Sequence, residues 1–298
     1  MTSPAVAAAR IRLARKGAIV GDPGPQAALR YASKNGRQVF AIGASWPELA
    51  DPAAITGIYH AAAQRERAQI KAMGRDLVVT RGFDALKPAA MVFEHVPLGP
   101  LAQFAIALGC KGPFWSIEAD DLAGPTALLQ ALEDLADGRC DQAMVAAYEF
   151  DPPAARACLL VRDDAAPPLV WSARFIAGRR DPGRADLEAV AESLGLRAGA
   201  LRFPAGAIAD MLVPPCTPDP RVLLDPPGTP DPRDPPDLRV LRGSADHHGL
   251  DLAIAALEHA AAGEAIVVWR HTPDGRGLLL GLCGGGAAPG AAAREAAP

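Results

Sequence analysis

Two neighbouring carboxylates, Asp120 and Asp121, stand where a short apolar stretch turns into a helix that opens at Gly124 and Pro125. Many enzymes present a catalytic side chain at such a strand-to-helix turn, and the positive end of the helix dipole favours negative charge there. Two close carboxylates can also divide into an acid and a base, because their repulsion raises the pKa of one of them. Neighbouring residues at a turn seldom point to one spot, so the alternative is that one of the pair caps the helix.

A second group of residues that could do chemistry is the histidine pair His247 and His248, directly before Gly249 and a predicted helix. Adjacent helical residues point about 100° apart, so the pair is predicted either to contribute to a pocket or to mark an exposed helix start. With Asp246 these histidines could form part of a metal site, but the chain has no HExxH motif, no histidine pair at helical i, i+4 spacing and no CxxC pair. We predict no metal and no cofactor.

The composition limits the classes of protein to which the chain can belong. Half of its 298 residues are apolar, which allows a sizeable core, and 30 basic against 34 acidic residues leave a net charge of −4. That balance argues against nucleic acid and anionic membranes as partners. The chain also contains no run of about 18 apolar residues, the length that would predict a membrane span. The five cysteines are widely spaced and odd in number, which argues against a disulfide framework and favours the cytoplasm.

The elements that must position these side chains follow from apolar periodicity and turn residues. Arginines interrupt the first residues too early for a signal peptide, and we expect an irregular start there. Helices are predicted at 52–73, where Asp51 and Pro52 supply the cap and first turn, at 185–194 and from 250 onward. Strands are predicted at 37–45, 76–82, 157–164, 169–178, 265–271 and 277–283. The arrangement of 157–164 and 169–178 favours an antiparallel pair or an excursion at a sheet edge.

The stretch 97–150 is predicted to run helix, strand, sharp turn, helix and strand, and the last of these strands is 142–149. The helix after the turn is two-faced at helical spacing. Its apolar side carries Leu128, Ala131, Leu132 and Leu135. Its polar side carries Gln130, Glu133, Asp134 and Asp137.

A proline-rich segment marks the one predicted internal boundary. Ten of the 23 residues from 214 to 236 are proline, so this segment must be an extended loop. It separates a first part, 1–213, which contains the turn at Asp121, from a reduced second part, 237–283. The low-complexity residues 284–298 are expected to be disordered.

The residues around the turn carry a resemblance to a known family. The segment "IALGCKGPFWSIEADDLAG" has a leucine–glycine pair, a glycine–proline pair, an apolar strand, and then Asp121 before Ala123 and Gly124. This order resembles the nucleophile region of β-ketoacyl synthases, members of the thiolase-like superfamily, with Asp121 where the family has its cysteine. The similarity continues through "ALLQALEDLADGRCDQAMVAAYE". A weaker similarity near the C-terminus places Pro227 and Arg242 where the family has its two catalytic histidines.

The resemblance implies a fold and a set of pocket residues. The implied fold is α/β and thiolase-like, with layers in the order helix, sheet, helix, sheet, helix and a reduced C-terminal half. Residues of the matching pattern are expected to form the binding region, and Trp115 beside Phe114 either narrows an acyl tunnel or belongs to the core. These residues are Gly112, Pro113, Phe114, Trp115 and Gly124.

The family's chemistry explains why Asp121 matters. Its cysteine acts as a thiolate that accepts an acyl chain, while the two histidines polarise the thioester carbonyl during decarboxylation. A carboxylate is a poor acceptor from a thioester, because its acyl product would be a mixed anhydride. Asp121 therefore argues against condensation. His247 and His248 are the candidates to substitute for the two missing catalytic histidines.

The resemblance implies a subunit without its own condensation chemistry, similar to the chain-length-factor partners of active ketosynthases in polyketide, aryl-polyene or fatty-acid biosynthesis. The implied partners are an active ketosynthase and an acyl carrier protein, in a heterodimer or a homodimer that pairs through the strand "QAMVAAYE". Two alternatives stay open. One is an acyl-thioester hydrolase or decarboxylase with Asp121 as general base, and the other is a scaffold or binding protein without catalysis.

Overall fold

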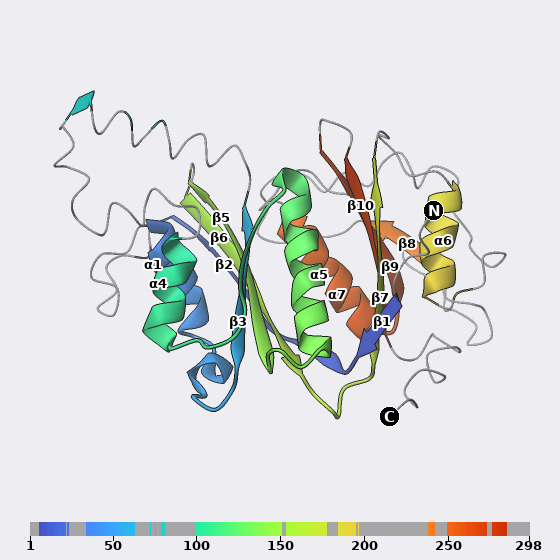
Figure 1. The fold of residues 1–298 in the computed structure, drawn as a ribbon, viewed down its shortest axis with the longest axis horizontal. Coiled ribbons are helices and arrows are strands. Elements are labelled where there is room, and N and C mark those ends of the chain that lie inside the picture. The colour runs from blue at the N-terminus through green and yellow to red at the C-terminus, as the bar shows by residue number, and fades with distance from the viewer. Residues whose placement is uncertain are drawn as a thin grey trace.

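The computed structural model arranges the chain in alternating layers of helix and sheet (Figure 1). Helices α1 (Lys34–Gly43) and α4 (Gly99–Leu108) cover one sheet, α5 (Ala123–Ala136) and α7 (Leu250–Ala261) lie between the two sheets, and α6 (Arg184–Ser193) covers the other sheet. The structure describes residues 6–21, 23, 34–62, 72, 75, 79–80, 99–150, 153–177, 184–194, 196, 238–241, 249–272 and 276–284. This is the α/β layer order that the sequence predicted.

The first sheet contains the strand that leads to the Asp121 turn. Its order is β2-β6-β5-β3-β4, in which β3, β4 and β5 are parallel and β6 is antiparallel to both β5 and β2. Its strands are β2 (Ile11–Val20), β3 (Thr56–Ala62), β4 (Phe114–Glu118), β5 (Gln142–Phe150) and β6 (Pro153–Arg162).

The second sheet repeats most of this plan. Its order is β1-β7-β10-β9-β8, in which β8 and β9 are parallel and β10 is antiparallel to both β9 and β7. Its strands are β1 (Val6–Ala9), β7 (Leu169–Ile176), β8 (Leu238–Leu241), β9 (Ala265–His271) and β10 (Gly277–Gly284). Strands β7, β10, β9 and β8 thus match β2, β6, β5 and β3 in order, direction and place along the chain.

Among the described residues, the second half has no counterpart of α4 and β4. In the first half, the chain passes from β3 through α4 and β4 before it enters the buried helix α5. In the second half, β8 ends at Leu241 and α7 begins at Leu250, with only eight residues between them. The C-terminal half is therefore reduced, as predicted.

Apolar side chains fill the spaces between the layers. The largest buried cluster lies around α5 and α7, between the two sheets, and smaller clusters lie under α1 and α4 and under α6. Leu128, Ala131, Leu132 and Leu135 on α5 are all fully buried, which confirms its predicted apolar side. None of the helices in the described part of the chain is long and apolar enough to cross a membrane.

Two predicted elements near the N-terminus have the wrong type. The segment 37–45 lies mostly in helix α1 rather than in a strand, because Val39 and Ile42, three residues apart, are buried on one helical face. The segment predicted as a helix from Pro52 contains strand β3, all seven residues of which are buried. Asp51 accepts a hydrogen bond from the Ala53 N–H at 2.9 Å, so it forms a local turn instead of capping a helix.

Three further predictions are corrected by the sheets. From residue 6 onward the N-terminal region is regular rather than irregular: β1 and β2 are separated by Arg10 alone and pair with different sheets. Strands β6 and β7 do not pair with each other, because the chain crosses from the first sheet to the second between them. In the segment 76–82, predicted as a strand, Val79 and Thr80 are helical and the other residues lie outside the described part.

Strand β5, which contains "QAMVAAYE", lies inside its sheet. It is hydrogen-bonded to β3 on one side and to β6 on the other, so its backbone has no edge left for a strand of another subunit. The prediction that this strand pairs across a dimer axis is therefore wrong. The proline-rich segment 214–236 and the tail 285–298 lie outside the described residues.

Candidate functional site

The turn between β4 and α5 has an unusual backbone. Asp120 has φ +47°, and it is the one non-glycine residue with positive φ in the described part of the chain. A short 3-10 turn, Asp120–Leu122, then leads into α5. The N-cap of α5 is Leu122, with no side-chain capping bond, so the prediction that Asp120 or Asp121 caps the helix is wrong. A left-handed aspartate is strained, and such strain often accompanies functional turns.

Asp121 lies beside a buried arginine from the other half of the molecule. Arg270 on β9 is only 4% exposed, and its Nε donates a hydrogen bond to the backbone oxygen of Asp121 at 3.2 Å. Its Nη2 lies 3.8 Å from Asp121 Oδ1, within ion-pair distance. The position that the sequence singled out therefore holds a carboxylate paired with a guanidinium, and the pair links the two halves.

The N-termini of the two central helices meet beside this pair. A Cβ added to Gly124 would lie 2.4 Å from the backbone nitrogen of Leu250, the first residue of α7. Gly249 has φ +79°, and a Cβ there would lie 2.8 Å from the Asp121 backbone oxygen. Gly124 and Gly249 are thus required because the backbones of the two helices approach too closely for any side chain.

The other residues predicted for binding lie at the far end of β4. An added Cβ at Gly112 would lie 2.5 Å from the Thr56 backbone oxygen, and the Pro113 carbonyl accepts a bond from the Ile58 N–H at 2.8 Å. Both residues therefore bring β4 against β3, and Phe114 packs toward α4. Since β4 runs for about 16 Å, these residues and Asp121 lie at its two ends. Their role in binding stays a prediction.

His247 and His248 lie outside the described residues, as do Pro227 and Arg242. The structure therefore does not test the prediction that the two histidines face the pocket. Among the described residues no group of three or more histidines, cysteines or acids is placed to hold a metal ion. An apolar cavity of about 90 Å³ lies elsewhere, lined by Leu13, Leu160 and Leu257 among others, and it does not include Asp121.

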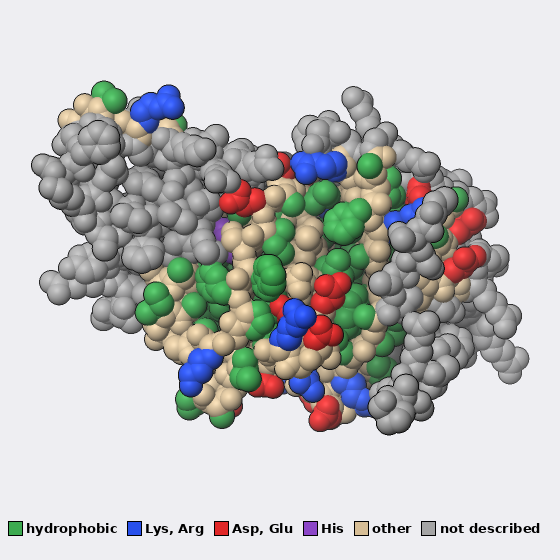
Figure 2. Space-filling model, viewed as in Figure 1, with side chains coloured by type: hydrophobic (Ala, Val, Ile, Leu, Met, Phe, Trp, Pro, Cys, Tyr) green, Lys and Arg blue, Asp and Glu red, His purple; other side chains and the backbone are tan. Residues whose placement is uncertain are grey.

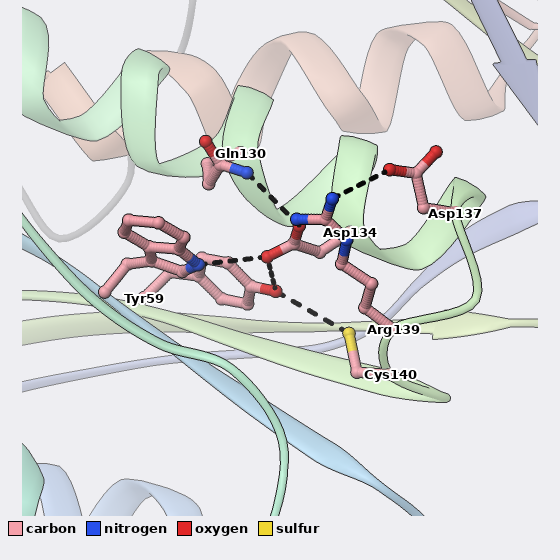
Figure 3. A network of polar contacts seen from close by, with 7 residues as sticks. Tyr59, Gln130, Asp134, Asp137, Arg139 and Cys140 are labelled. Carbon is pink, nitrogen blue, oxygen red and sulfur yellow. Dashed lines mark hydrogen bonds and ion pairs between the residues drawn. The ribbon is translucent and has the colours of Figure 1, made fainter.

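The structure also contains a buried polar cluster that the sequence did not reveal. Asp134 was predicted on the polar side of its helix, but it is fully buried. Figure 3 shows its contacts with Tyr59, Gln130 and Arg139. Tyr59 Oη and Trp115 Nε1 donate to Asp134 Oδ2 at 2.9 and 3.1 Å. Gln130 Nε2 and Arg139 Nη1 approach Oδ1 at 3.2 and 3.1 Å. The buried carboxylate is thus fully hydrogen-bonded, which offsets its desolvation.

Only tertiary contacts reveal this role of Asp134. The only local sign of this role in the sequence is Gln130, one helical turn before Asp134. A glutamine at this spacing is equally typical of a solvated helix face. Tyr59 is 75 residues away in sequence, and Trp115 is on the edge strand β4. We name this set, with Asp134 at its centre, the Asp134 cluster.

The described cysteines are not activated thiols. Burial raises the pKa of Cys158 to about 12 and also raises the pKa of Cys140 and Cys283. Burial likewise raises the pKa of the half-buried Cys110. Since the thiolate is the reactive form, none of these four thiols is prepared for acyl transfer at neutral pH.

Solved structures share the overall α/β fold of this chain. No family model matches the sequence, and no curated protein matches it. A β-ketoacyl synthase from Burkholderia phymatum STM815 is similar, with a TM-score of 0.56 at 11% identity, over 93% of this chain and 92% of that one. Ketosynthase twelve of the bacillaene polyketide synthase in Bacillus amyloliquefaciens gives 0.52 at 10% identity, over 85% of this chain and 61% of that one.

A third similar structure is a chain of the complex between a type II polyketide acyl-carrier protein and its ketosynthase. Its TM-score is 0.50 at 11% identity, over 86% of this chain and 83% of that one. The chain therefore has the β-ketoacyl synthase-like thiolase fold. It is a reduced form of that fold, because the described part of its second half has no counterpart of α4 and β4 and the chain spans 61% of the bacillaene ketosynthase chain.

Proposed function

We propose that this protein is a non-condensing β-ketoacyl synthase-like subunit that assists an active ketosynthase, as a chain-length factor does. One observation carries the proposal. Asp121, at the N-terminal end of the buried helix α5, is paired with the buried guanidinium of Arg270. We assign Asp121 to the place of the family's nucleophilic cysteine on the resemblance of the surrounding sequence.

The chemistry of Asp121 supports a role without condensation. Transfer of an acyl group from a thioester to a carboxylate would give a mixed anhydride, which is less stable than the thioester it replaces. Arg270 lies on the side of Asp121 that faces the second half, and the N-terminus of α7 closes against Gly124. Burial raises the pKa of the four described thiols, which disfavours the reactive thiolate at neutral pH.

The proposed partners are a cysteine-bearing ketosynthase and an acyl carrier protein in the cytoplasm, in polyketide, aryl-polyene or fatty-acid biosynthesis. The fold shared with ketosynthases supports this assignment. In such a complex the partner would supply the cysteine and the two histidines, and this chain would form one side of the shared structure.

The test is reconstitution with a cysteine-bearing ketosynthase and an acyl carrier protein from the same organism. We expect the chain to co-purify with that ketosynthase and, alone, to extend no carrier-linked acyl group by intact-protein mass spectrometry. The pair should extend the chain, and Asp121→Asn, which keeps the shape of the side chain, should preserve that activity.

Two outcomes would overturn the proposal. Extension by this chain alone would show that it condenses. Hydrolysis or decarboxylation of acyl thioesters by the chain alone, abolished by both Asp121→Ala and Asp121→Asn, would identify Asp121 as a general base in an independent enzyme.

A further inference from the structure

An apolar pocket lies where the chain crosses between the two sheets. One crossing joins β1 to β2 at Arg10, and the other joins β6 to β7 through residues 163–168 (Figure 1). The last turn of α7 and the end of β10 reach the same place, and these segments enclose the cavity of about 90 Å³. We name it the crossing pocket. It lies at the opposite end of α7 from the Asp121 turn, about 15 Å along the helix.

The crossing pocket has a buried apolar interior and an exposed rim. Its most deeply buried lining residues are Leu160 and Ala260, which are fully buried, and Gly284. Pro167 and Ala261 also line the pocket but are exposed, so it opens to solvent beside them. The pocket is therefore a short apolar hole that solvent molecules can reach.

The backbone prevents the protein from filling this hole with a side chain of its own at one wall. A Cβ added to Gly284 would collide with the backbone oxygen of Ala260, so the end of β10 can carry only glycine there. The alanines that line the pocket are too short to fill it. Empty apolar space is unfavourable, because the atoms around it lose van der Waals contacts. An apolar group that enters from solvent restores those contacts.

The mouth of the pocket is fixed in the free protein. Arg10 Nη1 donates to the backbone oxygens of Asp164 and Ala166 at 3.0 and 3.4 Å. Arg12 pairs with Asp163 at 2.7 Å, so both ends of the second crossing are held against the first. The two prolines that follow Ala166 have a restricted φ. A pocket with walls that are already ordered loses little conformational entropy when a ligand binds.

The surroundings of the mouth favour a small molecule over a protein partner. Lys16 forms an ion pair with Glu258, three residues before Ala261 in α7, and the Arg12–Asp163 pair lies beside the other crossing. Figure 2 shows charged side chains along the lower margin of the molecule, where the crossings lie in Figure 1, and hydrophobic ones in the middle of the face. A protein interface would need apolar area around the mouth. A small amphiphile needs only an apolar hole for its tail and a polar rim for its head.

We propose that the crossing pocket binds a small neutral amphiphile, a short-chain alcohol, with its alkyl tail among Leu13, Leu160 and Leu257. The cavity is smaller than the roughly 150 Å³ that accommodates benzene, so the tail that fits is a propyl or butyl chain. The head group is neutral because the charges beside the rim are already paired. The site is independent of the proposed function, since it does not include Asp121.

The test is a titration of the wild-type protein with n-butanol. Isotope-labelled leucine methyl groups are followed by NMR, and the signals of Leu160 and Leu257 should shift and saturate. We expect a dissociation constant on the order of 1 mM, because so small a ligand has few atoms to contribute. The butanediol with a hydroxyl group at each end has the same chain length but no apolar end, and it should give no saturable shift.

Matched variants show whether the alcohol occupies this pocket. Ala261→Trp adds a large side chain at the mouth from an exposed position, and it should weaken n-butanol binding about tenfold or more. Ala107→Trp is the control, because Ala107 is likewise exposed in the last turn of a helix, α4, but lies outside the pocket. Leu13→Ala enlarges the pocket at a half-buried wall and should shift the preference from butanol toward hexanol.

Three results would overturn the proposal. The first is the absence of any saturable shift at Leu160 and Leu257 below the alcohol concentration that unfolds the protein. The second is equal binding by wild type and Ala261→Trp, with circular dichroism showing that both are folded. The third is equal binding of n-butanol and the butanediol. None of these experiments contains a ketosynthase or a carrier protein, so their failure is distinguishable from failure of the proposed function.

Discussion

The two halves of the molecule share a strand order and a buried helix but differ in the outer part of each sheet. Each half has the same order of strands and one helix buried between the sheets, and each half holds the helix of the other by an ion pair. Arg270 of the second sheet pairs with Asp121 before α5, and Arg156 of the first sheet pairs with Asp251 in the first turn of α7. The acid lies at or near a helix N-terminus in both cases, where the dipole favours it.

What differs is the outer part of each sheet. The first half keeps α4 and β4, whereas the second half passes from β8 to α7 through residues 242–249. The shared interior depends on both buried helices, since each is packed against the other and both contribute to the central core. The outer strand contributes less to that core and can be lost from one half. The comparison therefore predicts that α5 and α7 are needed for stability, whereas an outer strand such as β4 is not.

The largest effect is expected where the two halves touch. Gly124→Ala would place a Cβ 2.4 Å from the Leu250 backbone, and neither helix can move without disturbing the central core. We expect a loss of about 3 kcal/mol or more in the free energy of unfolding, measured by urea denaturation.

The matched control for this substitution is Gly109→Ala. An added Cβ at Gly109 meets nothing within 4 Å, although its φ of +66° disfavours alanine. A loss of about 1 kcal/mol is expected there. Equal losses at Gly109 and Gly124 would mean that the contact between the helices is not a tight one.

The helices and strands that were predictable from the sequence are those in which apolar residues recur with one clear period and turn residues mark both ends. The stretch 99–150, α6, α7, β9 and β10 agree with the prediction, because apolar residues recur at helical spacing or in short runs bounded by turns. The segment 37–45 misled because Val39 and Ile42 fit a helix as well as a short strand. Strand β3 is buried on both faces and so has no alternation to mark it.

The candidate site was predictable only in part. Asp121 could be placed from its neighbours, since a strand, a turn and a helix follow each other within a few residues. Asp134 could not, because helical spacing groups it with Gln130 on a polar face, whereas its burial depends on Tyr59 and Trp115 from separate strands. The pairing of Asp121 with Arg270 also depends on distant chain segments, 149 residues apart.

An intermediate effect is expected from the two reciprocal ion pairs. Arg270 is 4% exposed, and it also holds the Asp121 backbone oxygen, so Arg270→Met should cost about 2–3 kcal/mol in unfolding free energy. In the other pair, Arg156 and Asp251 remain 21% and 23% exposed. Arg156→Met should therefore cost about 1 kcal/mol. Urea denaturation at neutral pH measures both values, and a larger loss at Arg156 would reverse the assignment of the tighter contact.

The smallest effect concerns Glu133, which lies on the buried helix that borders the β4 edge. Partial burial, then Asp134 and Asp137, raise its pKa above that of an ordinary glutamate. A carboxyl with a raised pKa in the folded state favours folding below the ordinary glutamate pKa, and this advantage is lost as the pH rises through the raised pKa. At pH 7 the charged form is therefore slightly unfavourable to the folded state. Glu133→Gln removes that penalty and should stabilise the protein by at most about 0.5 kcal/mol, because the side chain is only partly surrounded by protein and solvent screens most of its charge.

The pH and salt dependence of this difference identify its cause. Thermal unfolding of the wild type and Glu133→Gln should give the larger difference at pH 7, and the difference should vanish below about pH 4, where the wild-type carboxyl is protonated in both states. High salt at pH 7 should also reduce it, because part of the penalty is repulsion from Asp134 and Asp137. A destabilising Glu133→Gln substitution at pH 7 would show that Glu133 makes a favourable contact within the monomer. Glu133 on α5 would then contribute to the fold in the same way as Asp251 on α7, which is paired with Arg156.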